Sequence, residues 1–240
     1  MKKILIIASL FTATVTTAVA QITNATQYFD KINNFLSTNV KNGQVNYTAI
    51  NANKASLNEL VTYAGGKQKF ASVAEEKTFY LNTYNILVIK GIINNYPTKG
   101  PLTVPGFFDK KTYTVNAASV TLNGIENDII RKKYNDARIH FALVCGAVSC
   151  PPLQAYAYKT DKLDVQLDAL TKQSIQNNNF TKVDSKNNQV SVSMLFDWYK
   201  DDFVKYKGSV LGFINAYAKK PLAANTKVVT YTYDWSLNGK

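Results

Sequence analysis

The chain has 240 residues and a net charge of +12 at pH 7, but only one histidine and two cysteines. A basic excess can indicate nucleic-acid binding. Here the lysines are scattered in short groups, so we expect solvated basic faces and no nucleic-acid partner. An anionic cell-surface polymer is a partner that this charge still fits. The few histidines and cysteines match no zinc-finger or ribbon spacing, and we expect neither a metal nor a cofactor.

The first twenty residues have the pattern of a secretory signal peptide. A basic start, Met1-Lys2-Lys3, precedes an apolar run over residues 4–11, and Ala18-Val19-Ala20 has the form of a cleavage site. We therefore expect residues 1–20 to be removed. The mature protein, residues 21–240, is then periplasmic or secreted, has a net charge of +10 and has no membrane span. Its length suits a single domain.

Helical periodicity dominates the first half of the mature chain. Residues 26–36 and 54–64 are expected to form amphipathic helices, the second ended by Gly65-Gly66. Residues 73–95 give the strongest helix pattern, and their apolar side chains cover much of the circumference. This pattern predicts a central helix that is buried on several sides. Residues 112–116 alternate between polar and apolar types, which is typical of a half-buried strand.

The second half mixes both kinds of element without a regular strand–helix alternation. The expected elements are a helix from Thr121 to Lys133, a buried strand over 139–144, a helix over 161–175, a hairpin of 180–183 with 189–192, a helix over 209–218 and a closing strand within 228–238. This order favours an α+β fold, with helices packed on a small, mainly antiparallel sheet.

Polar side chains interrupt the apolar surface of the central helix and its neighbour. Asn82, Tyr84 and Asn85 lie within the 73–95 helix, and buried amides need hydrogen-bond partners. Two interpretations stay open: these side chains hold neighbouring loops in place, or they face a substrate. Glu126 lies in the middle of the following helix and is a further candidate for the site.

The stretch from Arg138 to Leu153 contains the only histidine, His140, and both cysteines, Cys145 and Cys150. In an exported protein the two cysteines can form a disulfide, or one can act as a thiol nucleophile with His140 as its base. A continuous strand would place His140 and Cys145 on opposite faces and about 16 Å apart. On geometry alone, Cys150 in the following loop reaches His140 more easily.

Four motifs in order resemble the bacterial and plant family catalogued as domain of unknown function 547 (DUF547). They are Glu76-Lys-Thr-Phe-Tyr-Leu-Asn-Thr-Tyr-Asn85, Leu122-Asn-Gly-Ile-Glu-Asn127, the stretch from His140 to Leu153, and Phe196-Asp-Trp-Tyr199. The likeness covers about residues 73–203, and Tyr233-Asp-Trp-Ser-Leu-Asn238 resembles the closing motif of the family.

The resemblance has implications for individual residues. Asn127 stands where many members have a second histidine, which puts any mechanism that needs that histidine in doubt. Plant members often keep a cysteine at the position of Cys145 and have serine at that of Cys150, which points to Cys145 as the more general thiol. We also suspect a distant similarity to papain-like and transglutaminase-like cysteine hydrolases, although the central helix here has no cysteine.

Together these features lead to two functional hypotheses. The first is a thiol-dependent hydrolase or acyl-transfer enzyme in the cell envelope, acting on a peptide, an amide or a small thiol compound. Cys145 or Cys150 is its nucleophile, His140 is the base, and Glu126 or an asparagine amide orients the imidazole. The second is a non-catalytic binding module in which the cysteines are structural.

Overall fold

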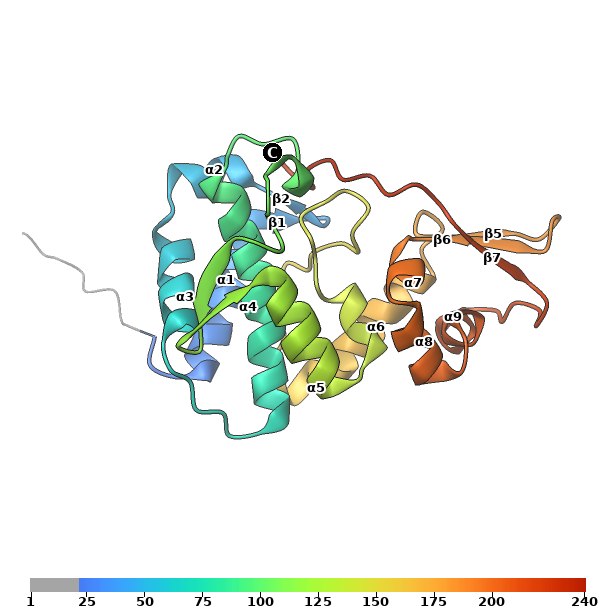
Figure 1. Cartoon of the computed structure of the whole chain (residues 1–240), viewed down its shortest axis with the longest axis horizontal. Coiled ribbons are helices and arrows are strands. Elements are labelled where there is room, and N and C mark those ends of the chain that lie inside the picture. The colour runs from blue at the N-terminus through green and yellow to red at the C-terminus, as the bar shows by residue number, and fades with distance from the viewer. Residues whose placement is uncertain (1–21) are drawn as a thin grey trace, which may run out of the picture.

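The computed structural model describes residues 22–240, and the predicted signal peptide and its cleavage site lie outside the described residues. The mixture of helices and short strands confirms the predicted α+β class (Figure 1). The helices are α1 (Ala25–Asn39), α2 (Tyr47–Ala52), α3 (Ala55–Gly65), α4 (Val73–Asn94), α5 (Lys132–Tyr134), α6 (Leu163–Ile175), α7 (Leu195–Trp198), α8 (Lys200–Lys207) and α9 (Val210–Tyr217). A π-helix, η2 (Gly124–Arg131), leads into α5, and short 3₁₀ turns are η1 (Pro101–Thr103), η3 (Ala137–Phe141) and η4 (Thr160–Lys162). Within residues 22–240, none of the helices has the length and hydropathy needed to cross a membrane.

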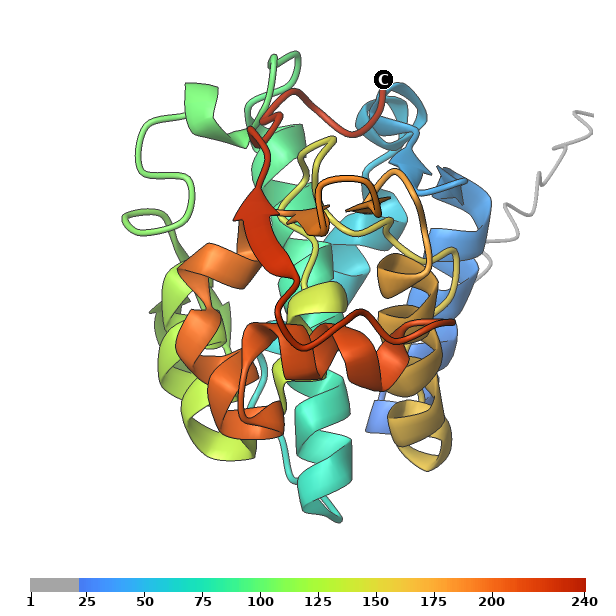
Figure 2. The same ribbon diagram turned by 90° about the vertical axis from the view of Figure 1, so that its right-hand side faces the viewer.

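Helix α4 is the centre of the fold, as its sequence pattern predicts. Every residue from Thr78 to Ile89 is buried, which is more than three helical turns. A helix buried on all sides must be covered by several other elements, and Figure 2 shows α4 running vertically through the middle of the molecule. Helices α1 and α6 lie on one side of it in that view, and α5 and α8 lie on the other.

The strands form three small sheets in place of the one sheet that the sequence suggests. The strands are β1 (Val40–Lys41), β2 (Gln44–Val45), β3 (Thr112–Val115), β4 (Ala118–Thr121), β5 (Thr181–Asp184), β6 (Gln189–Val192) and β7 (Lys227–Thr230). Three pairs are antiparallel hairpins, β1–β2, β3–β4 and β5–β6, while β7 adds to β6 in parallel. The predicted mainly antiparallel pairing is therefore confirmed.

The predicted buried strand over residues 139–144 is wrong. The segment forms η3 and then an irregular stretch, although its apolar side chains are buried as expected. Two groups that a strand would pair with another strand are bound by one side chain of α4: Asn85 donates Nδ2–H to the Ala142 carbonyl at 2.9 Å and accepts from the Val144 N–H at 2.9 Å. An asparagine on the central helix thus satisfies backbone groups that would otherwise require a ladder.

The C-terminal segment, residues 231–240, continues beyond β7 as an extended chain without forming the longer closing strand that was predicted. Figure 1 shows it running from β7 across the top of the view to an end near α2. Val148 N–H donates to the Ser236 carbonyl at 2.8 Å, and Asn238 N–H donates to the Gly146 carbonyl at 3.0 Å. The segment therefore fixes the loop that contains the two cysteines.

Candidate active site

One cavity of about 190 Å³ contains most of the predicted site. Tyr84, Glu126, His140, Cys145 and Cys150 all line it, although they come from separate elements. Its other walls are mainly aromatic, from the segments before η2, around α7 and near the C-terminus. These aromatic lining residues are Phe108, Trp198, Tyr199, Tyr233 and Trp235.

His140 is held at one ring nitrogen and free at the other. Its Nε2 lies 2.7 Å from Oδ2 of Asp202. The same Oδ2 accepts from Arg131 Nε at 2.7 Å, and Oδ1 of Asp202 accepts from Arg131 Nη2 at 3.1 Å. Burial alone would raise the pKa of Asp202, but the hydrogen bonds from His140 and Arg131 outweigh it and hold that pKa well below its usual range. Because the carboxylate can only accept, Nε2 carries a proton, and in the neutral form of the ring Nδ1 is then the acceptor.

The free nitrogen of His140 has no hydrogen-bond partner anywhere in residues 22–240 and is shielded from solvent. The imidazole stacks on the Tyr199 ring, with 3.9 Å between centroids and 15° between planes. The Arg131 guanidinium carbon lies 4.8 Å from the same Tyr199 centroid. The ring orientation is thus fixed while one acceptor is left unused, an arrangement that suits a base.

Asn127 extends this network. It accepts a hydrogen bond from Arg131 Nη1 at 2.7 Å, while the other guanidinium nitrogens bind Asp202. In this chain, the position where many DUF547 members have a second histidine therefore supports the arginine that holds Asp202. Asn127 does not line the cavity.

Glu126 does not orient His140, contrary to one of the predicted roles, because Asp202 is the group bound to the imidazole. The Glu126 carboxylate is buried and accepts a hydrogen bond from the Tyr84 hydroxyl at 3.1 Å. Burial and then the charge of Glu126 raise the pKa of Tyr84 well above its usual value, so Tyr84 stays a protonated donor. Among the ion pairs of residues 22–240, none includes Glu126.

Asn82 and Asn85 lie outside the cavity and hold neighbouring segments against α4. Asn82 donates to the Tyr158 carbonyl at 2.9 Å and accepts from the Tyr158 N–H at 2.9 Å, while its second N–H reaches the Thr78 carbonyl at 3.0 Å. Asn85 binds the 142–144 backbone in the same two-sided way. In the structure these two amides hold neighbouring loops in place and do not line the cavity.

Cys145 and Cys150 form a disulfide. Cys150 is buried, and its sulfur accepts from the Cys145 N–H at 3.0 Å, whereas Cys145 is partly exposed. The Tyr233 hydroxyl lies 3.3 Å from the sulfur of Cys145 and 3.1 Å from that of Cys150. Tyr233 therefore places a polar hydrogen beside both sulfurs, and a nucleophilic thiol is formed only when the disulfide is reduced.

Gly146 shapes the loop between the two cysteines. Its φ of +82° lies in the left-handed region that favours glycine, and a Cβ there would approach Val88 of α4 to 3.3 Å. The backbone can therefore turn sharply after Cys145 while staying close to the central helix. The geometric objection to His140 and Cys145 sharing a site assumed a continuous strand, and it does not apply because η3 and an irregular stretch connect these two residues.

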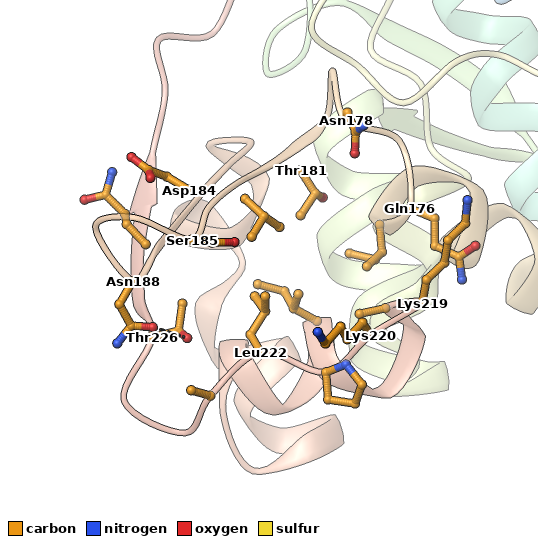
Figure 3. A pocket seen from close by; sticks show the side chains of 17 residues that line it. Gln176, Asn178, Thr181, Asp184, Ser185, Asn188, Lys219, Lys220, Leu222 and Thr226 are labelled. Atoms are coloured by element: carbon orange, nitrogen blue, oxygen red, sulfur yellow. Dashed lines mark hydrogen bonds between the residues drawn. The ribbon is translucent and has the colours of Figure 1, made fainter.

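A larger cavity of about 370 Å³ lies elsewhere, between the end of α6, α9 and the β5–β6–β7 sheet. Figure 3 shows Thr181 and Ser185 on one side of it and Lys219, Lys220 and Leu222 on the other. None of the predicted site residues lines this cavity. It offers no grouping of nucleophile and base, so the smaller cavity is the candidate active site.

Metal ligation is not a feature of the described residues. No group of three or more histidine, cysteine, aspartate or glutamate side chains in residues 22–240 is arranged to hold a metal ion.

Comparison with known proteins supports the family resemblance. Residues 68–175 match the family described as "Protein of unknown function, DUF547". The matched region contains α4, Glu126, His140 and both cysteines, whereas Asp202 and the C-terminal segment lie outside it. Neither the curated proteins nor the solved structures gave a match.

Sequence reasoning missed the partners that complete the cavity. Asp202 lies on α8 and Tyr233 in the C-terminal segment, 62 and 93 residues beyond His140 in the chain. The motifs ending at Tyr199 and beginning at Tyr233 carry the family resemblance, and they supply most of the aromatic walls. No pattern in the sequence singled out Asp202.

Proposed function

We propose that the protein is a thiol-dependent hydrolase or acyl-transfer enzyme, with Cys145 as nucleophile, His140 as base and Asp202 as the residue that orients His140. One observation carries the proposal. The imidazole is anchored through Nε2 to a carboxylate held ionised, Nδ1 has no hydrogen-bond partner in residues 22–240, and His140 lines the cavity that both cysteines line. A fixed base with a free acceptor, on a residue that lines the same cavity as two sulfurs, suits nucleophilic catalysis.

The reaction begins from the reduced protein. The Cys145 thiol gives its proton to Nδ1 of His140, and the thiolate attacks a carbonyl carbon to form a C–S bond. The imidazolium returns the proton to the leaving amine or alcohol as its bond to carbon breaks, which leaves an acyl group on Cys145. Water or another acceptor then loses a proton to Nδ1 and attacks the thioester carbon. The C–S bond breaks, the acyl group leaves on the acceptor oxygen or nitrogen, and the imidazolium returns the proton to the sulfur of Cys145.

The disulfide makes this activity dependent on reduction. A dithiol reductant supplies two electrons and two protons, becoming a disulfide as the Cys145–Cys150 bond is replaced by two thiols. Cys145 is the better nucleophile on access, because it is partly exposed while Cys150 is buried. Cys150 is then the residue that blocks it in the oxidised state.

We also propose a substrate class and a location for this activity. A peptide, an amide or a small thiol compound in the periplasm or outside the cell suits the sequence of the first twenty residues and the carbonyl chemistry above. We also propose a distant similarity to papain-like and transglutaminase-like hydrolases. In those enzymes the nucleophile lies on the buried helix, whereas α4 has Asn82 and Asn85, so the loop at 145–150 must supply it.

The direct test uses Cys150→Ser and the generic acyl donor p-nitrophenyl acetate. We expect this variant to release p-nitrophenolate without a reductant and to acquire an acetyl group on Cys145, as detected by peptide mass spectrometry. The wild-type protein should need a dithiol reductant for the same reaction. Cys145→Ser is the matched control and should be inactive in both conditions. Equal rates for the two serine variants would overturn the assignment of Cys145.

A non-catalytic binding module is the second candidate, and the disulfide itself favours it. A cysteine pair that is linked and partly buried suits a structural role in an exported protein. This candidate predicts that the reduced wild-type protein and Cys150→Ser accept no acetyl group, while the cavity still binds a ligand. A peptide or an anionic surface polymer is the partner class for this alternative.

A further inference from the structure

The cavity walls form a continuous aromatic cluster around its mouth. Trp198 and Tyr233 have ring centroids 4.9 Å apart, Tyr233 and Trp235 lie 4.8 Å apart, and the two tryptophans lie 5.7 Å apart. Phe108 adds a further ring 6.2 Å from Trp235. Trp198 is 42% exposed, so part of this cluster is open to an approaching ligand.

Glu126 brings to this aromatic cavity a buried carboxyl group that forms no ion pair within residues 22–240. The hydrogen bond to Asp202 and, to a smaller extent, the charge of Glu126 raise the pKa of Arg131. The guanidinium hydrogen-bonds to Asp202 at two atoms and to Asn127 at a third, and it makes no ion pair with Glu126. Glu126 is hydrogen-bonded by the neutral Tyr84 hydroxyl and makes no ion pair with a residue in the described part of the chain. Burying a carboxylate without a cation costs free energy, and a positively charged ligand would offset that cost.

These features narrow the ligand to one chemical class. We propose that the cavity binds an organic ammonium group, with aromatic faces around the cation and Glu126 as its counter-charge. Aromatic rings attract cations through their electron-rich faces, Trp most strongly. An anion would be repelled by Glu126, and a neutral apolar group would leave that carboxylate unbalanced. That the ammonium group belongs to the substrate rests on the function proposed above. Binding of an ammonium group in the cavity does not itself require a thiol.

The size of the cavity sets the size of the group. Its volume of about 190 Å³ is below the roughly 300–1,000 Å³ of sites that enclose a drug-sized molecule. A side-chain or head-group amine fits such a space, with the rest of the ligand outside. The overall positive charge of the protein does not oppose this strongly, because at physiological ionic strength charges beyond about 8 Å are largely screened.

The test compares choline with 3,3-dimethylbutan-1-ol, which has nearly the same shape and no charge. Binding is measured by calorimetry and tryptophan fluorescence on the oxidised protein, in which Cys145 cannot react. We expect choline to bind on the order of tenfold more tightly than the alcohol, as cation–π attraction and one counter-charge imply. Equal affinities for the two compounds, or no binding of choline, would overturn the proposal.

Two variants locate the preference in the cavity. Glu126→Gln should abolish the preference for choline over the alcohol, and Asp161→Asn, which removes one exposed negative charge elsewhere, should keep it. If Glu126→Gln does not fold, Trp235→Leu provides the same test, because it removes one aromatic wall from the C-terminal segment. Retention of the full preference in the folded cavity variants would contradict the assignment. Since the oxidised protein is used, loss of thiol activity and loss of cation binding can be told apart.

Discussion

Two groups of buried polar residues lie on helix α4 and against it, and they differ in how fully their hydrogen-bonding atoms are used. Asn82 and Asn85 face the backbone of other segments and are bound as both donor and acceptor. Around Tyr84 the neighbouring cavity holds a carboxylate without an ion pair and an imidazole nitrogen without a partner. The comparison separates groups that hold the fold together from groups left available for a ligand or a proton.

The largest expected effect concerns His140, whose Nδ1 has no hydrogen-bond partner in residues 22–240. His140→Asn removes the base, so the acetylation of Cys145 in the Cys150→Ser background should slow by about 10²- to 10⁴-fold. The far-UV circular dichroism and the cooperativity of urea unfolding should be retained. Acetylation at an unchanged rate in the folded variant would show that Nδ1 takes no part in the chemistry.

The next largest effect concerns Asn85, whose side chain both donates and accepts hydrogen bonds. Asn85→Ala leaves the Ala142 carbonyl and the Val144 N–H without their partner in a buried place, and each such group costs about 1–3 kcal/mol. We expect urea unfolding to show a loss of about 2–4 kcal/mol. Asn34→Ala, on the exposed face of α1, is the control and should stay within about 0.5 kcal/mol of the wild type. Similar losses of unfolding free energy for Asn85→Ala and Asn34→Ala would contradict the stabilising role of the Asn85 hydrogen bonds.

The disulfide should contribute less to stability than the asparagine contacts. The sequence separation of Cys145 and Cys150 is five, and closing so short a loop is worth about 2 kcal/mol in the chain-entropy account. Reduced and oxidised wild-type protein are compared by urea unfolding under matched conditions. A loss much greater than this on reduction would mean that the disulfide is a main support of the fold, and would favour the binding-module alternative.

The smallest effect is a dependence of stability on acid. The pKa of Asp202 is lowered in the folded protein by His140 and Arg131, so its stabilising contribution is present above the unfolded value of about 4 and is lost as pH falls toward the folded value. The difference in unfolding free energy between wild type and Asp202→Asn should therefore shrink below about pH 4. Urea titrations between about pH 5 and pH 2 measure it, and a difference that stays constant with pH would contradict the paired geometry.

Most of the fold could be predicted because periodicity is a local property. The pattern of 73–95 predicted a helix buried on several sides, and α4 is one. The prediction of a strand over 139–144 was wrong because an apolar run indicates burial but does not indicate which groups bind its backbone N–H and C=O. Those partners are supplied by Asn85, more than fifty residues earlier.

The candidate site was predicted in part for the same reason. His140, Cys145, Cys150, Glu126 and Tyr84 were recognised by residue type, and they do line one cavity. The pairing of His140 with Asp202 depends on how α8 packs beside η3. Local sequence patterns do not predict this packing. The redox state of the cysteines was likewise left open by the sequence.

The central claim is that His140 serves as the base for Cys145, and the thiol pKa tests it most directly. The rate of iodoacetamide alkylation of Cys145 is measured in Cys150→Ser between about pH 5 and pH 10. The account predicts a midpoint below the value of about 8.5 for an ordinary cysteine, moving upward when His140→Asn is added. A midpoint near or above about 8.5 in both proteins would contradict it.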